Sequence, residues 1–512
     1  MTSLTGEPRA AARRFAILFG CIVVCWLAVM FVQLYFFGYA AVDSWCYAAP
    51  ADLAKAPFQL TMPFLGAFEG ANKAWGLHWP GGLLLSSVVT PYLPHGPATY
   101  VAIPIVYWLL ASAATAVLVR RYTGSRWLAL YAFLLVACDR LCSSIAWFER
   151  YEMLGAAIAI AGILALCGQE DGRSRARYAT IGVAFFILPL IHPVFSGLGL
   201  GLLLTLALRT IALKQRWTRL SAAAGGYAAG WAVFIGYFWS RPWLYAQFRN
   251  HADQNLEITR EASPPGFRTF LVHLYETDRP TRAGAVIYLV AFCTVAALVC
   301  GLWKCRREWK EYLAREDLAV FVSLALGGTL VLSQMTYNTF YWATAWPFAA
   351  ALACLAMHRV WQRYPKRMGL IGGVAAALML MHMSYWPART YLWYKTGWVN
   401  MRSELREFAQ SLPRARRLFI PEVLWDTYPD GNGEVYMNSL PFSAGAPMQQ
   451  RYASYIVPLI RPGDVLVVDV LQSHPCLIGP PAAGWKEIRH RKVVYMGADH
   501  PHGFDLTAYQ KL

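Results

Sequence analysis

Residues 98–121 read ATYVAIPIVYWLLASAATAVLVRR, an apolar run without a charged side chain before its two final arginines. A helix needs about 20 apolar residues to cross a hydrocarbon layer about 30 Å thick. The run has this length, and arginines directly after it are typical of a cytoplasmic border. The stretch therefore predicts a transmembrane helix, and similar runs recur from Phe15 to Tyr385.

The composition of the whole chain agrees with a membrane protein. Of its 512 residues, 57% are hydrophobic and only 15% are charged, whereas soluble chains carry roughly 25% charged residues. The formal net charge is +17, but the basic residues cluster between the apolar runs, as they do in cytoplasmic loops. This placement argues against nucleic acid as a partner. Most of the 11 cysteines lie inside apolar runs, which excludes a disulfide framework and leaves one pairing open among Cys46, Cys138, Cys142 and Cys476.

We expect an all-α polytopic bundle of about 11 transmembrane helices with a cytoplasmic N-terminus and an external C-terminus. His192-Pro193 interrupts the apolar residues 178–213, so two helices in a hairpin are predicted there. The other spans are expected at 15–37, 98–119, 127–141, 151–167, 221–238, 284–303, 318–334, 340–358 and 370–386.

The chain divides into a membrane domain, 1–388, and a soluble extracytoplasmic α/β domain, 389–512, because the composition becomes that of a soluble chain after Tyr394. Two outer loops, 39–97 and 241–283, interrupt the membrane domain, and the short apolar segment 81–92 predicts a helix in the membrane interface. In the C-terminal domain the pattern predicts a helix at 401–412 and strands at 417–421, 464–470 and 492–496.

Three short segments near the predicted outer face carry residues suited to chemistry. Asp43 follows the first span, His78 lies in Gly76-Leu-His-Trp-Pro-Gly-Gly82, and Glu149 and Glu152 flank Arg150 at the start of the fourth span. Ionisable groups at this depth are costly unless they have a partner or a function. The alternative readings are a solvated Asp, a His in an interfacial aromatic belt, and a turn held by a local ion pair.

Taken in this order, the three segments resemble the GT-C superfamily of polyprenyl-phosphate-sugar-dependent glycosyltransferases. This group includes protein O-mannosyltransferases and lipid A aminoarabinose transferases. The matching positions are Asp43, His78 to Pro80, and Arg150 with Glu152, although His-Trp-Pro stands where His-Pro-Pro is commoner. Looser similarities are His192-Pro193, Gln247, and Tyr341 with Pro347.

The resemblance implies an inverting hexosyl- or pentosyltransferase at the outer face of an inner membrane. A polyprenyl-phosphate-linked sugar would be the donor, and a lipid, glycan or protein would be the acceptor. Asp43 would act as the general base, and Arg150 would stabilise the leaving phosphate. Glu152 would orient the acceptor or hold a divalent cation together with Asp43. The other expected substrate-binding residues are His78, Glu149, His192, Gln247, Arg249 and Tyr341.

Two other readings stay open at the level of sequence. A transporter or flippase of a lipid-linked sugar predicts ionisable residues near the middle of several spans. A degenerate relative could serve as a scaffold through its C-terminal domain. Near the chain end, Asp499-His-Pro-His502 could bind a metal or form a polar turn.

Overall fold

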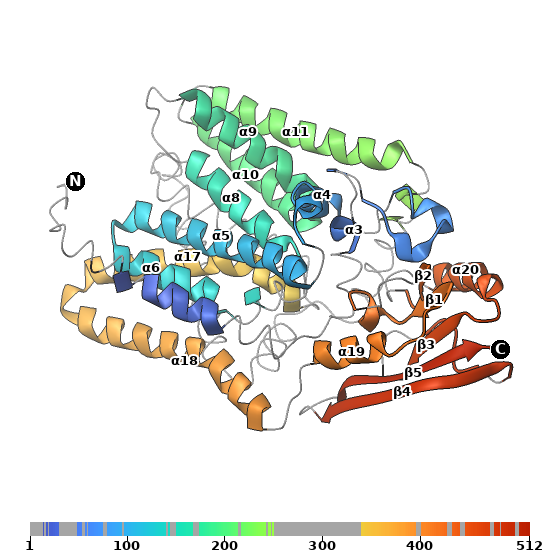
Figure 1. Cartoon of the computed structure of the whole chain (residues 1–512). Helices are drawn as coiled ribbons and strands as arrows, with labels where there is room; N and C mark the ends of the chain where they lie inside the picture. Colours follow the sequence, from blue (N-terminus) through green and yellow to red (C-terminus); the bar gives the residue numbers. More distant parts are fainter. Residues whose placement is uncertain are drawn as a thin grey trace.

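In the computed structural model, the chain forms a helical part and, beside it, a small domain built on a β-sheet (Figure 1). The residues that it describes are 14, 17–18, 20–29, 49–53, 57–58, 60–74, 79–94, 97–139, 142–143, 150–166, 174–212, 214, 217–241, 244–246, 248–249, 339–395, 401–427, 433–440, 446–471, 476–481, 483–496 and 501–512. The spans predicted at 284–303 and 318–334 lie outside these residues.

The long helices follow the predicted apolar runs closely. Two of the described helical segments, Ala102–Thr123 and Val194–Ala212, are both long and apolar enough to cross a membrane by themselves. The total of about 11 spans stays a prediction. The main elements of the helical part are α4 (Pro80–Ser86), α5 (Pro97–Thr123), α6 (Arg126–Ala137), α8 (Glu152–Leu166), α9 (Ser174–Ile191), α10 (Pro193–Ala212), α11 (Thr218–Trp239), α17 (Thr339–Arg363) and α18 (Met368–Lys395), with short helices α3 (Ala49–Asp52), η1 (Pro63–Leu65), η2 (Phe68–Gly70), η3 (Thr90–Tyr92) and η5 (Pro365–Arg367).

Helix α9 ends at Ile191 and α10 begins at Pro193, so the predicted break at His192-Pro193 is confirmed. The interfacial helix expected over 81–92 is shorter than predicted. Only α4 and the turn η3 form there, and Pro80, Gly81 and Leu83 are buried. Two consecutive glycines, Gly81 and Gly82, allow α4 to pack closely onto the end of α9.

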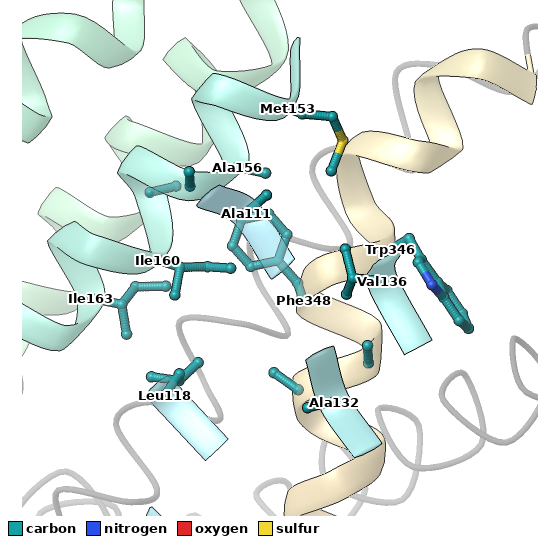
Figure 2. Close-up of a cluster of buried hydrophobic side chains, with 14 of the residues drawn as sticks. Ala111, Leu118, Ala132, Val136, Met153, Ala156, Ile160, Ile163, Trp346 and Phe348 are labelled. Carbon is teal, nitrogen blue, oxygen red and sulfur yellow. The ribbon is translucent and has the colours of Figure 1, made fainter. Parts of the chain in front are cut away.

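Helices α5, α6, α8 and α17 share one apolar core. Its fully buried side chains include Ala111 of α5, Ala132 of α6, Ile160 of α8 and Phe348 of α17, and Figure 2 shows how these helices direct small and large residues toward one another. The indole of Trp108 donates to the Val136 carbonyl (3.0 Å). Burial of apolar and aromatic residues on facing helices therefore joins four elements into one unit.

Two arginines donate hydrogen bonds to the last carbonyl groups of α8. Arg177 of α9 donates through Nε to the Ala165 carbonyl (2.7 Å), and Arg219 of α11 donates through Nη1 to the Leu166 carbonyl (3.0 Å). The last carbonyls of a helix lack intrahelical donors and carry partial negative charge. These two basic residues, which in sequence mark only a cytoplasmic border, thus tie the end of α8 to α9 and α11.

The C-terminal domain is built on one five-stranded sheet of order β2-β1-β3-β5-β4. Strands β2, β1 and β3 are parallel, whereas β5 pairs antiparallel with β3 and with β4. The strands expected at 417–421 and 464–470 are confirmed as β1 and β3, while β2 and β5 were not predicted. The elements are α19 (Met401–Gln410), β1 (Arg417–Ile420), η6 (Glu422–Leu424), β2 (Glu434–Met437), α20 (Ala446–Ile456), η8 (Val457–Leu459), β3 (Val465–Asp469), β4 (Trp485–Met496) and β5 (Pro501–Lys511).

Glycines set the close approach of α9 and α11. A Cβ at Gly226 would lie 2.1 Å from the Gly182 carbonyl oxygen, and a Cβ at Gly230 would lie 2.2 Å from the Phe186 carbonyl oxygen. This small-xxx-small spacing is a common device for bringing two membrane helices into backbone contact. The approach leaves no space for a side chain at either position.

We expect Gly230→Ala to destabilise the chain by about 1–3 kcal/mol, because the added methyl group must push α9 away. Gly225 of the same helix has open space around its Cβ position. Gly225→Ala should therefore be neutral or slightly stabilising, since Ala is the better helix former by about 1 kcal/mol. Thermal unfolding of both variants in detergent tests this, and equal Tm values would contradict the packing described here.

Candidate active site

The site begins where α4 is anchored to the end of α9. The indole Nε1 of Trp79, the N-cap of α4, donates to the Pro189 carbonyl at 2.5 Å. In a continuous helix that carbonyl would accept from the N–H four residues later, but Pro193 has no N–H. Trp79 thus satisfies an acceptor that the helix break leaves open. Its ring also stacks on Phe234 of α11, with the centroids 4.6 Å apart.

Two glycines after Trp79-Pro80 allow this docking. A Cβ at Gly81 would lie 2.6 Å from backbone atoms of Leu190, and a Cβ at Gly82 would lie 2.5 Å from Cβ of Tyr151. Any larger residue would push α4 away from both neighbours. The glycines therefore bring Trp79 and Pro80 against the ends of α9 and α8.

The first turns of α8 and α10 are packed together in the same way. A Cβ at Gly155 would lie 2.3 Å from the ring of Phe195, so the ring packs directly against the backbone of α8. Arg150 and Glu152 at the start of α8 are consequently held next to the His192 turn.

Arg150 and Glu152 form a buried ion pair. The Nε and Nη2 atoms of Arg150 both lie 2.6 Å from Oε1 of Glu152, and each residue is only 5% exposed. Within the described part of the chain, the second carboxylate oxygen, Oε2, is buried without a hydrogen-bond partner. A buried acceptor in this state is costly, which is typical of an oxygen that meets a ligand.

His192 lies in the turn between α9 and α10, where the charges of Arg150 and Glu152 both affect its pKa. Burial lowers the pKa of His192 to about 4, the Glu152 carboxylate opposes this change, and the Arg150 guanidinium adds to it. Its Nδ1 accepts from the Val194 N–H (3.4 Å). Near neutral pH the imidazole is therefore uncharged and offers hydrogen bonds without adding positive charge to the site.

Of the residues predicted from sequence, the structure brings Arg150, Glu152 and His192 together. Arg249 is exposed beyond the end of α11, although its neighbour Phe248 packs on Trp79 with ring centroids 5.0 Å apart. Tyr341 lies in the first turn of α17. The remaining predicted positions, Asp43, His78, Glu149 and Gln247, lie outside the described residues.

Trp79 and Tyr151 were not among the site residues predicted from the sequence. Tyr151 separates the two members of the ion pair and contacts Tyr107 edge-on at 6.0 Å between ring centroids. The signal for Trp79 was present in Gly81 and Gly82, which indicate a close approach of backbone to a neighbour. What they approach could be learned only from the fold.

A second buried pair joins α6 to α18. Oδ2 of Asp139 lies 3.9 Å from Nε2 of His382, and Oδ1 of Asp139 accepts from the Cys142 N–H (2.9 Å). His382 also hydrogen-bonds the Leu135 carbonyl (3.1 Å), to which the Trp346 indole donates as well (2.7 Å). These contacts tie the end of α6 to α17 and α18, and they were not predicted from the sequence.

The described residues include no group of three or more His, Cys, Asp or Glu placed to hold a metal ion. Glu152 could supply one carboxylate oxygen to a cation, while its expected partner Asp43 lies outside the described part. Within that part Cys138, Cys142 and Cys476 are free thiols. Pro501 and His502, expected in a turn or metal site, instead begin β5.

Comparisons with known proteins identify the fold. No protein-family model matches the chain, and no curated protein matches its sequence. The apo crystal structure of ArnT from Cupriavidus metallidurans aligns with a TM-score of 0.55 at 14% identity, covering 97% of this chain and 98% of that one. ArnT bound to undecaprenyl phosphate aligns with a TM-score of 0.53 at 16% identity, covering 90% and 94%. The similarity to the GT-C fold predicted from sequence is thus confirmed over nearly the whole length.

From the buried ion pair we predict how substitutions change the free energy of unfolding. Arg150→Gln should destabilise the chain by about 3–5 kcal/mol, because it leaves the Glu152 carboxylate buried without its cation. Adding Glu152→Gln should recover much of this loss, since both buried charges are then gone. Thermal unfolding of the two single variants and the double variant forms a cycle. Strictly additive effects would contradict a direct pair.

Proposed function

We propose that this chain is a membrane glycosyltransferase that moves a sugar from a polyprenyl-phosphate carrier to an acceptor at the outer face of an inner membrane. The observation that carries the proposal is the buried Arg150–Glu152 pair beside His192, in which Oε2 of Glu152 is bonded to none of the described residues. The fold supports it, because ArnT has the same fold and has been crystallised with undecaprenyl phosphate.

The reaction class fits the charges of the site. An acceptor oxygen attacks the anomeric carbon of the sugar while the bond from that carbon to the phosphate oxygen breaks. The acceptor proton passes to a base, and the carrier leaves as polyprenyl phosphate with increased negative charge. A preorganised cation is the group that stabilises such a leaving group. Arg150 fits this role because Glu152 fixes its guanidinium within a dry environment.

Glu152 acts in this proposal mainly through Arg150. Its Oε1 accepts both hydrogen bonds from the guanidinium, which fixes the direction of the remaining Arg150 N–H groups. Its Oε2 is left as an acceptor for a sugar or acceptor hydroxyl. The neutral His192 can exchange hydrogen bonds with the same ligand without adding a charge.

Asp43 remains our choice for the general base, with inversion at the anomeric carbon. It follows the first predicted span, and the first outer loop that contains it continues to Trp79 and α4 at the site. A divalent cation between Asp43 and Glu152 would serve the same phosphate through oxygen ligands. The transporter reading finds less support, since the buried charges at α8 lie at one helix entrance.

Asp43→Asn should lower kcat by about 10²–10⁴-fold, because the amide cannot take the acceptor proton. The assay uses the purified full chain, a radiolabelled polyprenyl-phosphate sugar and a panel of acceptors. Glu487→Gln, a change at an exposed carboxylate of β4, is the matched control and should leave kcat unchanged. Equal rates for Asp43→Asn and the wild-type chain would exclude Asp43 as the base.

Arg150→Lys should lower kcat by about 10²–10³-fold, because an ammonium group cannot keep the fork on Oε1 of Glu152 and face a phosphate as well. Arg414→Lys, at an exposed arginine, should leave the rate unchanged. Binding of undecaprenyl phosphate to both variants separates carrier affinity from chemistry. Transport of the intact lipid-linked sugar by the wild-type chain, without bond cleavage, would refute the proposed function.

A further inference from the structure

The first outer loop belongs to two cores at once. Its residues Met62, Phe64, Leu65 and Phe68 are buried in the same cluster as Leu405, Phe408, Met448 and Tyr452 of the C-terminal domain. Leu60, two residues before Met62, is 2% exposed and packs instead with Leu83 of α4 and Tyr151. Figure 1 shows this loop between the helices and the sheet domain.

Polar contacts fix the loop on the C-terminal domain. The Tyr452 hydroxyl donates to the Phe64 carbonyl (3.1 Å), and the Ala67 N–H donates to the Tyr455 hydroxyl (3.1 Å). Arg451 and Glu69 form an ion pair at 2.9 Å. Two tyrosines and an arginine on one helix, α20, therefore hold both the backbone and the side chains of the loop.

Gly66 lies where the loop packs most closely against tyrosines of the C-terminal domain. Its φ is +58°, and a Cβ there would lie 2.8 Å from Cε1 of Tyr436 and 3.0 Å from the Tyr455 hydroxyl. The loop is also closed on itself, because the Met62 N–H donates to the Ala71 carbonyl (2.8 Å). A loop closed in this way and held at several points is restrained as one body, and Leu60 lies only two residues outside its closing bond at Met62.

The N-terminal end of this loop lies next to the candidate site. Leu60 packs in one cluster with Leu83 and Tyr151, and Tyr151 lies between Arg150 and Glu152 in sequence. Downstream, only a few residues separate Ala71 from Trp79, whose indole is bonded to Pro189. The loop thus connects α20 of the C-terminal domain with the residues that flank the ion pair.

We propose that the C-terminal domain is a positioning element for the transfer site. Tyr452, Tyr455 and Arg451 are positioning residues that hold the loop segment 60–71, so that Leu60 keeps Tyr151, and with it Arg150 and Glu152, in place. The proposal rests on the proposed function. It gives the C-terminal domain a role in the rate of transfer instead of in recognition alone.

The test compares two glycine variants of the full-length chain in the transfer assay. Gly66→Ala should lower kcat about ten-fold or more, because small misplacement of catalytic groups is costly, while KM for the donor changes less. Gly463→Ala is the matched control, since Gly463 also has a positive φ (+88°) in the C-terminal domain but open space at its Cβ position. Rates are normalised to folded, monodisperse protein, so that loss of folded chain does not count as loss of kcat.

A charge exchange keeps the test decisive if Gly66→Ala fails to fold. Arg451→Glu and Glu69→Arg should each lower kcat, and the double exchange should restore it. Loss in both single variants without recovery in the double variant would overturn the role of this pair. A Gly66→Ala rate equal to that of Gly463→Ala, with an active wild-type chain, would overturn the positioning proposal alone. An inactive wild-type chain would overturn the proposed function and the positioning proposal with it.

Discussion

The missing N–H of Pro193 is the constraint around which the site is built. It ends α9 at Ile191 and leaves the Pro189 carbonyl without its intrahelical donor. In a largely apolar environment an open carbonyl has no water to satisfy it, and the indole of Trp79 fills this need. One proline therefore creates the turn that holds His192 and also the acceptor that anchors the first outer loop.

Close packing around Trp79 fixes the positions of the Arg150 and Glu152 charges. Gly81, Gly82 and Gly155 each lie where a Cβ would collide with a neighbouring residue, so α4, α8 and the α9–α10 turn pack closely, with Tyr151 and Phe195 fitted against glycine backbone. The buried Arg150–Glu152 pair is retained within this contact. Such a pair contributes little to stability compared with an apolar replacement, and its presence here is more consistent with function. The loop's second attachment, to α20, brings the C-terminal domain into the same structure.

Long periodic features of the fold were predictable because each depends on local composition. Apolar runs with basic residues at one end located α5, α8 and α10, since a helix is the form in which a single segment satisfies its own backbone in lipid. The β5 strand was missed although Phe504, Leu506 and Ala508 alternate with polar residues. Its first residues resembled a polar turn, and the antiparallel pairing with β3 and β4 that defines it is not local.

The sequence by itself determined the membrane character of the chain, the break at His192-Pro193 and the candidate residues Arg150 and Glu152, because proline chemistry, hydropathy and charge are properties of single segments. Only the tertiary structure decided that these segments meet, that Trp79 bonds the end of α9 and Tyr151 packs beside α4, and that Phe64 is buried with the C-terminal domain while Leu60 packs with Tyr151. Contacts between residues far apart in the chain depend on the shapes of all the surfaces involved. No local pattern records those shapes.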